Sequence, residues 1–147
     1  MMRYFTFLVL FLASFGTQAN AQDIGQRLAN CLISQTTGSD RVALARWIGF
    51  SIAAHSSIAR SVAIPEETLE QSDKRIANLL TELLTQRCVD ETRAVFLVGG
   101  DAAMESAFDA LGRVAMSEVM LDQNVNSSLT RFLNHVDESE FKGLLTE

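Results

Sequence analysis

Residues 37–55 read TGSDRVALARWIGFSIAAH and carry the clearest helix signal in the chain. Thr37 and Asp40 stand at the spacing of a capping box, which predicts that a helix begins there, although Asp is shorter than the usual Glu. From Val42 to Ile52 the apolar side chains are spread almost all round this helix, and a helix that is apolar on most sides is a buried one. The sequence therefore predicts an all-α fold with this helix at its centre.

The rest of the chain repeats the helical pattern, because its apolar residues recur at spacings of three and four. No segment shows the alternation of a half-buried strand, and Pro65 stands where it suits the first turn of a helix. We expect a compact bundle of five or six helices. Outside residues 37–55, the predicted helices cover approximately residues 23–34, 65–87, 89–98, 101–121 and 125–136, with a further turn or two in 138–145.

The first residues have the order of a secretory signal peptide. Arg3 carries an early positive charge, residues 4–16 are almost all apolar, and Ala19 and Ala21 are small residues at a cleavage site. The apolar run is too short to span a bilayer as a helix. We expect cleavage after Ala21 and export to the periplasm, with no membrane anchor left on the product.

Cleavage there divides the chain into a signal peptide, residues 1–21, and a single helical domain, residues 22–147. All eighteen acidic residues lie in the second part, and the formal net charge of the whole chain is −6. The closest approach to a basic cluster is the pair Lys74 and Arg75, so binding to nucleic acid or anionic lipid has no electrostatic basis. The acidic balance suits solubility or a cationic partner, and we expect that partner to be another protein.

Cys31 and Cys88 are the only cysteines, and an even number in an exported protein predicts a disulfide. Cys31 follows Leu28 and Cys88 follows Leu84 at helical spacing, so both are expected to face inward. Two free buried thiols or a redox-active pair are alternatives, although the chain has no Cys-x-x-Cys motif. Lipidation of Cys31 is a further alternative, and a metal site would lack the close ligand pairing of zinc motifs.

His55, Arg41 and Arg46 are the candidate ligand-binding residues. His55 shares a helix face with Leu44 and Ile48 and stands near a helix C-terminus, where an imidazolium is favoured. A cleft that gathered this histidine, the two arginines and carboxylates could serve a small-ligand carrier or an enzyme. The alternative interpretation is a half-buried histidine that bonds to backbone carbonyls.

The sequence has no recognised catalytic motif, since it contains neither Gly-x-Ser-x-Gly nor His-Glu-x-x-His. The stretch 99–101, Gly-Gly-Asp, resembles part of a phosphate loop without its Gly-Lys-Ser or Gly-Lys-Thr continuation, and a break between two helices explains it better. Met104, Met116 and Met120 could offer thioethers to copper, but core filling is the commoner use. The sequence thus leans against an enzyme and predicts neither metal nor cofactor.

A spaced pattern runs through the first half of the chain after the signal peptide: Cys31, Thr37, Asp40, Arg41, Leu44, Trp47 and His55. It resembles small periplasmic helical proteins of Gram-negative bacteria that have no assigned function. In those proteins the histidine is usually followed by proline, whereas Ser56 follows it here. The resemblance extends to residues 108–112 and to Asp137, and it implies a periplasmic helical domain with no chemistry attached.

The expected function is that of a non-enzymatic protein-binding module, in the manner of an inhibitor or an immunity protein. Periplasmic immunity proteins, which neutralise cell-wall hydrolases, can also be small, helical and disulfide-bonded, which is an analogy of size and compartment only. The alternative is a small-ligand carrier or an enzyme with a site around His55. An enclosed polar pocket around His55 would favour that alternative, whereas a filled core with an apolar outer patch would favour the binder.

Overall fold

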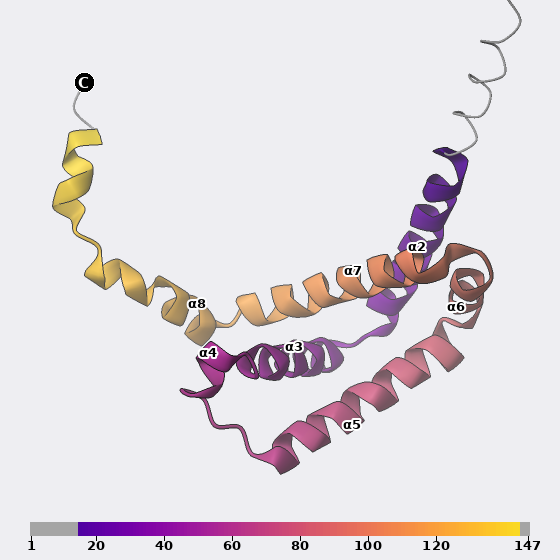
Figure 1. The fold of residues 1–147 in the computed structure, drawn as a ribbon, viewed down its shortest axis with the longest axis horizontal. Coiled ribbons are helices and arrows are strands. Elements are labelled where there is room, and N and C mark those ends of the chain that lie inside the picture. The colour runs from indigo at the N-terminus through magenta and orange to yellow at the C-terminus, as the bar shows by residue number, and fades with distance from the viewer. Residues whose placement is uncertain (1–14, 145–147) are drawn as a thin grey trace, which may run out of the picture.

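The computed structural model describes residues 15–144, and each of its elements in that range is a helix (Figure 1). No strand occurs among these residues, which confirms the predicted all-α fold class. Residues 1–14 of the predicted signal peptide, and Leu145 at the end of the last predicted turn, lie outside the described part. None of the described helices is long and apolar enough to cross a membrane.

The α-helices are joined or continued by short turns of π-helix and 3-10 helix. The predicted boundaries hold to within a few residues, with three differences. The first helix begins at Phe15 rather than near Asp23, since no proline between them stops it. The helix predicted over residues 125–136 is α-helical only to Thr130 and continues as a 3-10 turn, and a short helix over residues 56–59 was not predicted. The α-helices are α2 (Phe15–Gln35), α3 (Gly38–Ala53), α4 (Ser56–Ala59), α5 (Glu66–Glu82), α6 (Val89–Ala94), α7 (Gly100–Met120) and α8 (Gln123–Thr130). The π-helical turns are η1 (Leu83–Arg87) and η2 (Val95–Gly99), and the 3-10 turns are η3 (Arg131–His135) and η4 (Glu138–Leu144).

The capping box at the start of α3 forms as predicted. The Thr37 hydroxyl accepts a hydrogen bond from the Asp40 backbone N–H at 3.2 Å, and the Asp40 carboxylate accepts one from the Thr37 N–H at 3.0 Å. These bonds give partners to backbone N–H groups that a helix start otherwise leaves without any. The bond from the Thr37 N–H is also the main reason why the pKa of Asp40 lies below its ordinary value.

The centre of the molecule is the crossing of α2 and α7. Leu28 and Leu32 on α2 and Leu111 on α7 are fully buried, and these two helices share the most extensive contact in the fold. Small residues let the helix backbones approach closely, because a Cβ added to Gly25 would stand only 2.8 Å from the carbonyl oxygen of Ala103. The buried apolar surface at this crossing is the main source of stability.

The prediction that α3 is the central helix is wrong. Its buried side chains are limited to Ala43, Leu44 and Ala45, whereas Val42 and Ile52 are about half exposed. α3 packs on α7 along one side and on α5 along another, so its remaining apolar side chains face hollows or solvent. Large apolar residues all round the helix predicted burial on every side, but only two neighbouring helices cover it.

The predicted disulfide joins Cys31 near the end of α2 to Cys88, which lies between η1 and α6. The two Cα atoms are 5.9 Å apart, and Cys88 is fully buried. Next to the bridge, the Arg87 guanidinium donates to the Gln35 carbonyl at 2.7 Å and pairs with the Glu82 carboxylate at 2.7 Å. The end of α2 is therefore fixed to the turn that follows α5.

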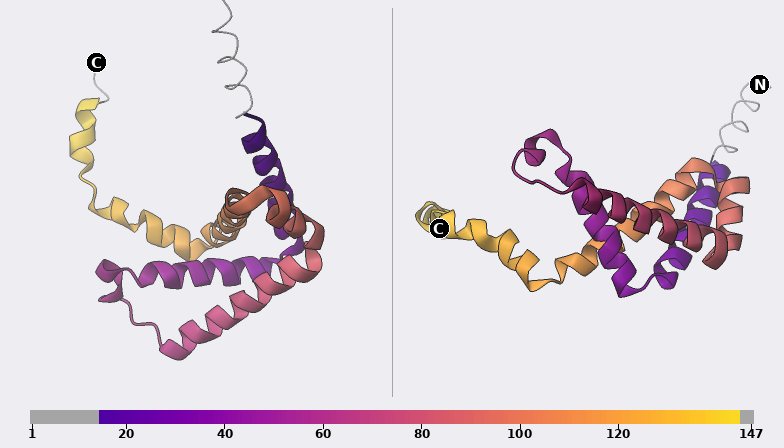
Figure 2. Two further views of the ribbon diagram at one scale, coloured as in Figure 1. Left: turned by 45° about the vertical axis from the view of Figure 1, so that its right-hand side comes forward. Right: turned by 90° about the horizontal axis from the view of Figure 1, so that it is seen from below.

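Residues 121–144, here called the C-terminal arm, leave the bundle after α7 and extend away from it (Figures 1 and 2). Contacts of α8 run to the end of α7 and to η3, and none of the arm's described side chains is buried. The molecule therefore consists of a packed bundle and an arm that packs on little of it.

Candidate functional site

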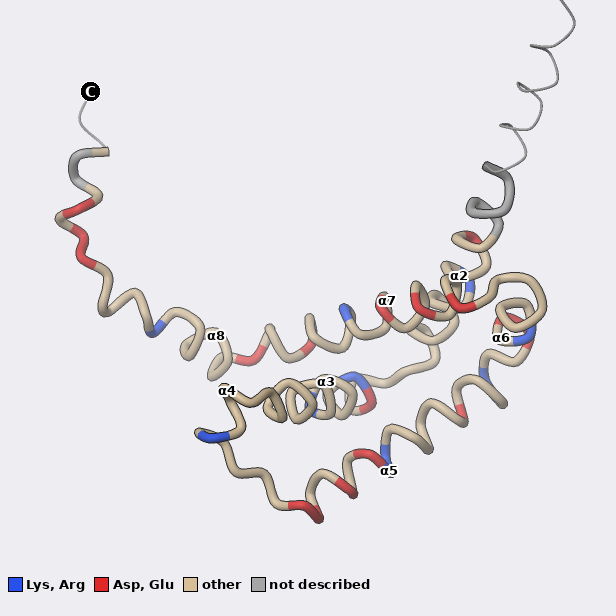
Figure 3. Tube along the Cα trace, viewed as in Figure 1, with Lys and Arg blue, Asp and Glu red and all other residues tan. Residues whose placement is uncertain are grey.

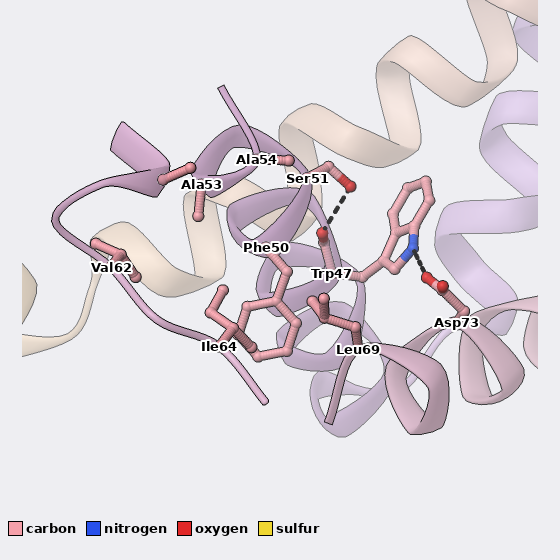
Figure 4. A pocket seen from close by; sticks show the side chains of 10 residues that line it. Trp47, Phe50, Ser51, Ala53, Ala54, Val62, Ile64, Leu69 and Asp73 are labelled. Atoms are coloured by element: carbon pink, nitrogen blue, oxygen red, sulfur yellow. Dashed lines mark hydrogen bonds between the residues drawn. The ribbon is translucent and has the colours of Figure 1, made fainter. Parts of the chain in front are cut away.

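The surface of the bundle is hollowed beside Trp47, between α3, α4 and α5 (Figure 4). This cavity, here called the α4 hollow, has a volume of about 310 Å³. Figure 4 shows the side chains of Phe50, Ile64 and Leu69 gathered together within it. The lining is mainly apolar and consists of Trp47, Phe50, Ser51, Ala53, Ala54, Ala59, Val62, Ile64, Leu69 and Asp73.

The α4 hollow exists because α3 and α5 diverge and a short connection bridges their open ends (Figure 1). α3 ends at Ala53, and the His55 ring accepts a hydrogen bond from the Ser57 N–H at 3.3 Å at the start of α4. Ile64 precedes Pro65, which favours an extended backbone there. The connection thus passes along the side of α3 and contributes Val62 and Ile64 to the lining of the hollow.

Trp47 forms a wall that the α4 hollow shares with a second cavity. Its indole N–H donates to the Asp73 carboxylate at 2.8 Å, which fixes the ring against α5. The second cavity, here called the α7 hollow, has a volume of about 320 Å³ and lies between α3, α5 and α7. Its lining is apolar throughout and consists of Leu44, Trp47, Ile48, Leu80, Phe108, Leu111 and Gly112.

Acidic residues gather at the start of α5 (Figure 3), the helix that contributes Leu69 and Asp73 to the lining of the α4 hollow. Glu66, Glu67 and Glu70 are exposed and precede Asp73 on this helix. Lys74 pairs with Glu70 at 2.6 Å, but an exposed pair of this kind contributes little to stability. The first two carboxylates also interact favourably with the positive end of the helix dipole. The hollow is therefore apolar inside and acidic along its α5 border.

The three residues predicted to bind a ligand have separate places in the structure. Arg41 donates to the Glu118 carboxylate at 3.0 Å and to the Thr36 carbonyl at 2.9 Å, so it braces the start of α3 against α7. His55 is exposed and caps α4, and Arg46 is exposed on α3. None of these three side chains lines the α4 hollow or the α7 hollow. Their role in binding a ligand stays a prediction.

Metal-ligating side chains do not cluster in the part of the chain that the structure describes. Among residues 15–144, no group of three or more His, Cys, Asp or Glu side chains is placed to hold a metal ion. Met104 and Met116 are half-buried and pack against the core, which is the core-filling use that their spacing favoured. The two hollows are therefore considered as binding sites on the basis of their apolar lining.

No protein-family model matches the chain, and no characterised protein or solved structure matches it either. The functional argument therefore rests on the residues of this chain. Sequence reasoning missed both hollows, because it placed the apolar residues of α3 in a central core. One signal in the sequence spoke against that placement. Trp47 stands among those residues, and because a buried tryptophan needs a hydrogen-bond partner for its indole N–H, it does not suit a wholly apolar core.

Proposed function

We propose that the protein is a non-enzymatic protein-binding module that holds an apolar, basic segment of its partner in the α4 hollow. The observation that carries this proposal is the pairing of an open apolar cavity with an acidic border on α5. An inhibitor or an immunity protein would use such a surface to cover a segment of another exported protein. The proposed place of action is the periplasm, and the disulfide is compatible with an oxidising compartment.

The size of the α4 hollow suits the anchor residues of a protein interface. Its volume of about 310 Å³ is at the small end of the range for ligand pockets, roughly 300–1,000 Å³. Binding energy at interfaces is concentrated in a few large side chains that fill desolvated pockets. Trp47 and Phe50 provide aromatic walls for one or two such side chains, and the hydrogen bond to Asp73 holds the first wall in place.

The charge on α5 suits a basic partner. Asp73 lines the hollow, Glu66, Glu67 and Glu70 precede it on the same helix, and the formal net charge of the chain is −6. Complementary charge of this kind steers a partner to the surface and rejects acidic competitors. The apolar interior would then hold the partner, while the acidic border would select it.

A carrier or enzyme site around His55 has less support. The His55 Nδ1 atom accepts a hydrogen bond from the Ser57 N–H and lies 2.8 Å from the Ser57 hydroxyl oxygen. Its side chain is exposed and lies outside both hollows. These contacts give the ring a capping role at the start of α4.

A synthetic amphipathic helix made of Leu and Lys tests the proposed function directly. Trp47 is the only tryptophan and lines both hollows, so its fluorescence reports binding at either one without a label. A Val62→Asp variant then assigns the signal to the α4 hollow. We expect a saturable change in emission with this peptide, and a much weaker one with a peptide of the same pattern made of Leu and Glu. Equal responses to both peptides would contradict the charge argument, and no response to either would contradict the hollow as a binding site.

Two valines of nearly equal exposure provide a matched pair of variants. Val62 lines the α4 hollow and is 45% exposed, whereas Val42 lies on α3 outside the hollow and is 49% exposed. Val62→Asp should weaken binding of the Leu and Lys peptide at least tenfold, because it places a carboxylate among the anchor contacts. Val42→Asp makes the same chemical change and should leave the affinity unchanged. Equal losses in both variants would overturn the assignment.

Export is tested separately by sequencing the N-terminus of the protein recovered from the periplasm. The proposed cleavage site predicts that the protein begins at Gln22 or close to it. A product that keeps Met1, or one that remains in the cytoplasm, would contradict the proposed location without bearing on the hollow.

A further inference from the structure

The C-terminal arm exposes large apolar side chains that its own bundle does not cover. Six of them are at least half exposed, from Leu129 at 51% to Leu121 at 81%. Exposed apolar surface of this extent usually marks a contact with another molecule. The six side chains are Leu121, Leu129, Phe132, Leu133, Phe141 and Leu144.

Hydrogen bonds at the junction with α7 fix the direction of the arm. The Asp122 carboxylate accepts from the N–H groups of Asn124 and Val125 at 2.7 and 3.2 Å. The Asn126 side-chain amide donates to the Met120 carbonyl at 2.8 Å. The Asp122 bonds cap α8 itself, whereas the Asn126 bond ties α8 to the last residue of α7. The arm points away from its own bundle (Figures 1 and 2), so its apolar side is available to a different molecule.

The apolar residues of the arm are spaced as in helices that bind in grooves. Val125, Leu129, Phe132 and Val136 follow one another at intervals of four, three and four residues. In the structure α8 ends at Thr130, so Val125 and Leu129 lie one α-helical turn apart, while Phe132 follows in the 3-10 turn η3 and Val136 is extended. Leu129 and Phe132 are the exposed members of this stripe, and large apolar side chains of this kind serve as anchors when a segment binds in a groove. The arm thus presents a stripe of apolar anchors with no charged residue among them.

The α7 hollow is the uncharged surface that fits this stripe. Its seven lining residues include no charged or polar side chain, whereas the α4 hollow includes Asp73 and has an acidic border. Asp137, Glu138 and Glu140 make the end of the arm acidic, so the border of the α4 hollow would repel it. The hollow and the stripe are therefore both apolar and uncharged, and both belong to this chain.

We propose that the arm of one copy lies in the α7 hollow of a second copy, and that the second arm does the same in return. Helix α7 carries Phe108 and Gly112 of the hollow, and the arm begins about 13 Å further along the same helix from Gly112. Two α7 helices that run antiparallel around a two-fold axis would bring each arm to the hollow of the other copy. Such reciprocal contacts are typical of two-fold symmetric dimers.

The surface available is sufficient for a stable dimer when the whole arm docks on the partner copy, including the exposed side chains outside the stripe. Free apolar side chains of this size expose roughly 100–250 Å² each, so six that are half exposed or more leave on the order of 700 Å² per arm. Two reciprocal contacts approach the standard interface of about 1,600 Å² in total. The proposal rests on the arm and the α7 hollow, and it goes beyond the binding function assigned to the α4 hollow.

The molar mass in solution, measured by size-exclusion chromatography with light scattering, tests the proposal. All variants are expressed from the full-length sequence. Their masses are compared after whatever N-terminal processing the host cells carry out. We expect the protein to have twice the mass of one chain. Phe132→Asp should reduce the mass to that of one chain, because it places a charge on the exposed stripe. Asn134→Asp adds the same charge off the stripe and should keep the doubled mass.

A second variant blocks the hollow rather than the arm. A Cβ at Gly112 would meet only the Ile48 side chain at 4.0 Å, so Gly112→Leu fills the hollow with its own side chain without a backbone clash. We expect it to halve the mass, with a far-ultraviolet circular dichroism spectrum like that of the unmodified protein. Gly49→Leu adds the same side chain where nothing lies within 4 Å, and it should keep the doubled mass.

Three results would overturn the proposal. The first is an unmodified protein with the mass of one chain at all concentrations. The second is a Gly112→Leu variant that keeps the doubled mass, because the arms would then pair with each other. The third is a Phe132→Asp variant that keeps it. Val62→Asp should leave the mass doubled, so failure of the dimer and failure of the proposed function are distinguishable.

Discussion

The crossing of α2 and α7 and the seam between α3 and α5 are built from different kinds of residue. At the crossing, Gly25 and Ala103 bring two backbones close together, and Leu28 is fully buried between helices. Along the seam, Trp47 and Ile48 are only half-buried and line two hollows. Close packing needs small residues beside large ones. The chain thus has one closed region, the closely packed crossing of α2 and α7, and one open region, the seam between α3 and α5.

The largest effect on stability is expected from a mutation that creates a cavity at the crossing of α2 and α7. Leu28→Ala should lower the free energy of unfolding by about 2–5 kcal/mol, because Leu28 is fully buried where α2 meets the core. Ile52→Ala removes an aliphatic side chain that is 54% exposed on α3, and it should change stability by less than about 1 kcal/mol. Denaturant unfolding measures both values. If both variants lost the same free energy of unfolding, the distinction between the two regions would be contradicted.

The disulfide sharpens the comparison, because it belongs to the closed region alone. Replacing both cysteines, Cys31→Ala with Cys88→Ala, should cost about 2–4 kcal/mol, since the bridge closes a long loop. The sequence separation is 57 residues. In a domain of this size each 1 kcal/mol corresponds to about 3–6 °C in melting temperature. A variant that melts at the temperature of the unmodified protein would show that α2 does not depend on the bridge.

A smaller effect is expected at the start of α3, where the open seam begins. Thr37→Ala removes the hydroxyl that accepts from the Asp40 N–H, and loss of such a cap costs about 1 kcal/mol. Thermal unfolding followed by circular dichroism measures the loss. Ser39→Ala is the control, because it changes an exposed hydroxyl in the same turn that accepts a bond from Arg75 at 3.2 Å and takes no part in the cap. A loss no greater than that of the control would mean that the capping box does not stabilise α3.

The Asp40 carboxylate of the same capping box should make stability depend on pH. The pKa of Asp40 is lowered in the folded protein, mainly by the hydrogen bond from the Thr37 N–H. The contribution of this carboxylate is therefore complete above its unfolded pKa and is lost as the pH falls through the lower folded value. Asp40→Asn should flatten the fall in stability below about pH 4, the region of the ordinary aspartate pKa. An unchanged acid profile would contradict the assignment.

Much of the fold could be predicted from the sequence, because its signals were local. The capping box at Thr37, the break at Gly99 and Gly100, and the inward position of Cys31 and Cys88 each depend on residues a few positions apart. The central position of α3 was predicted wrongly because large apolar residues were given more weight than small ones. Glycine and alanine on α2 and α7 add little hydrophobicity, yet they decide which helices can approach most closely.

The candidate site could not be predicted in the same way. A hollow depends on how far α3 and α5 diverge, and neither helix encodes that angle in its own apolar pattern. The sequence predicted a helix over residues 125–136, but it could not tell whether the apolar side chains of that segment were covered. The site predicted around His55 followed the chemistry of single residues, whereas the hollows depend on the packing between helices.

Amide hydrogen exchange measured by mass spectrometry, with and without the Leu and Lys peptide, tests the division into a closed and an open region most directly. In the free protein, α2 and α7 should exchange most slowly, because amides in packed regions exchange only through larger openings. With the peptide, protection should rise over residues 47–54 and 62–73, which line the α4 hollow. Uniform exchange across the bundle, or a gain in protection confined to α2 and α7, would contradict the account.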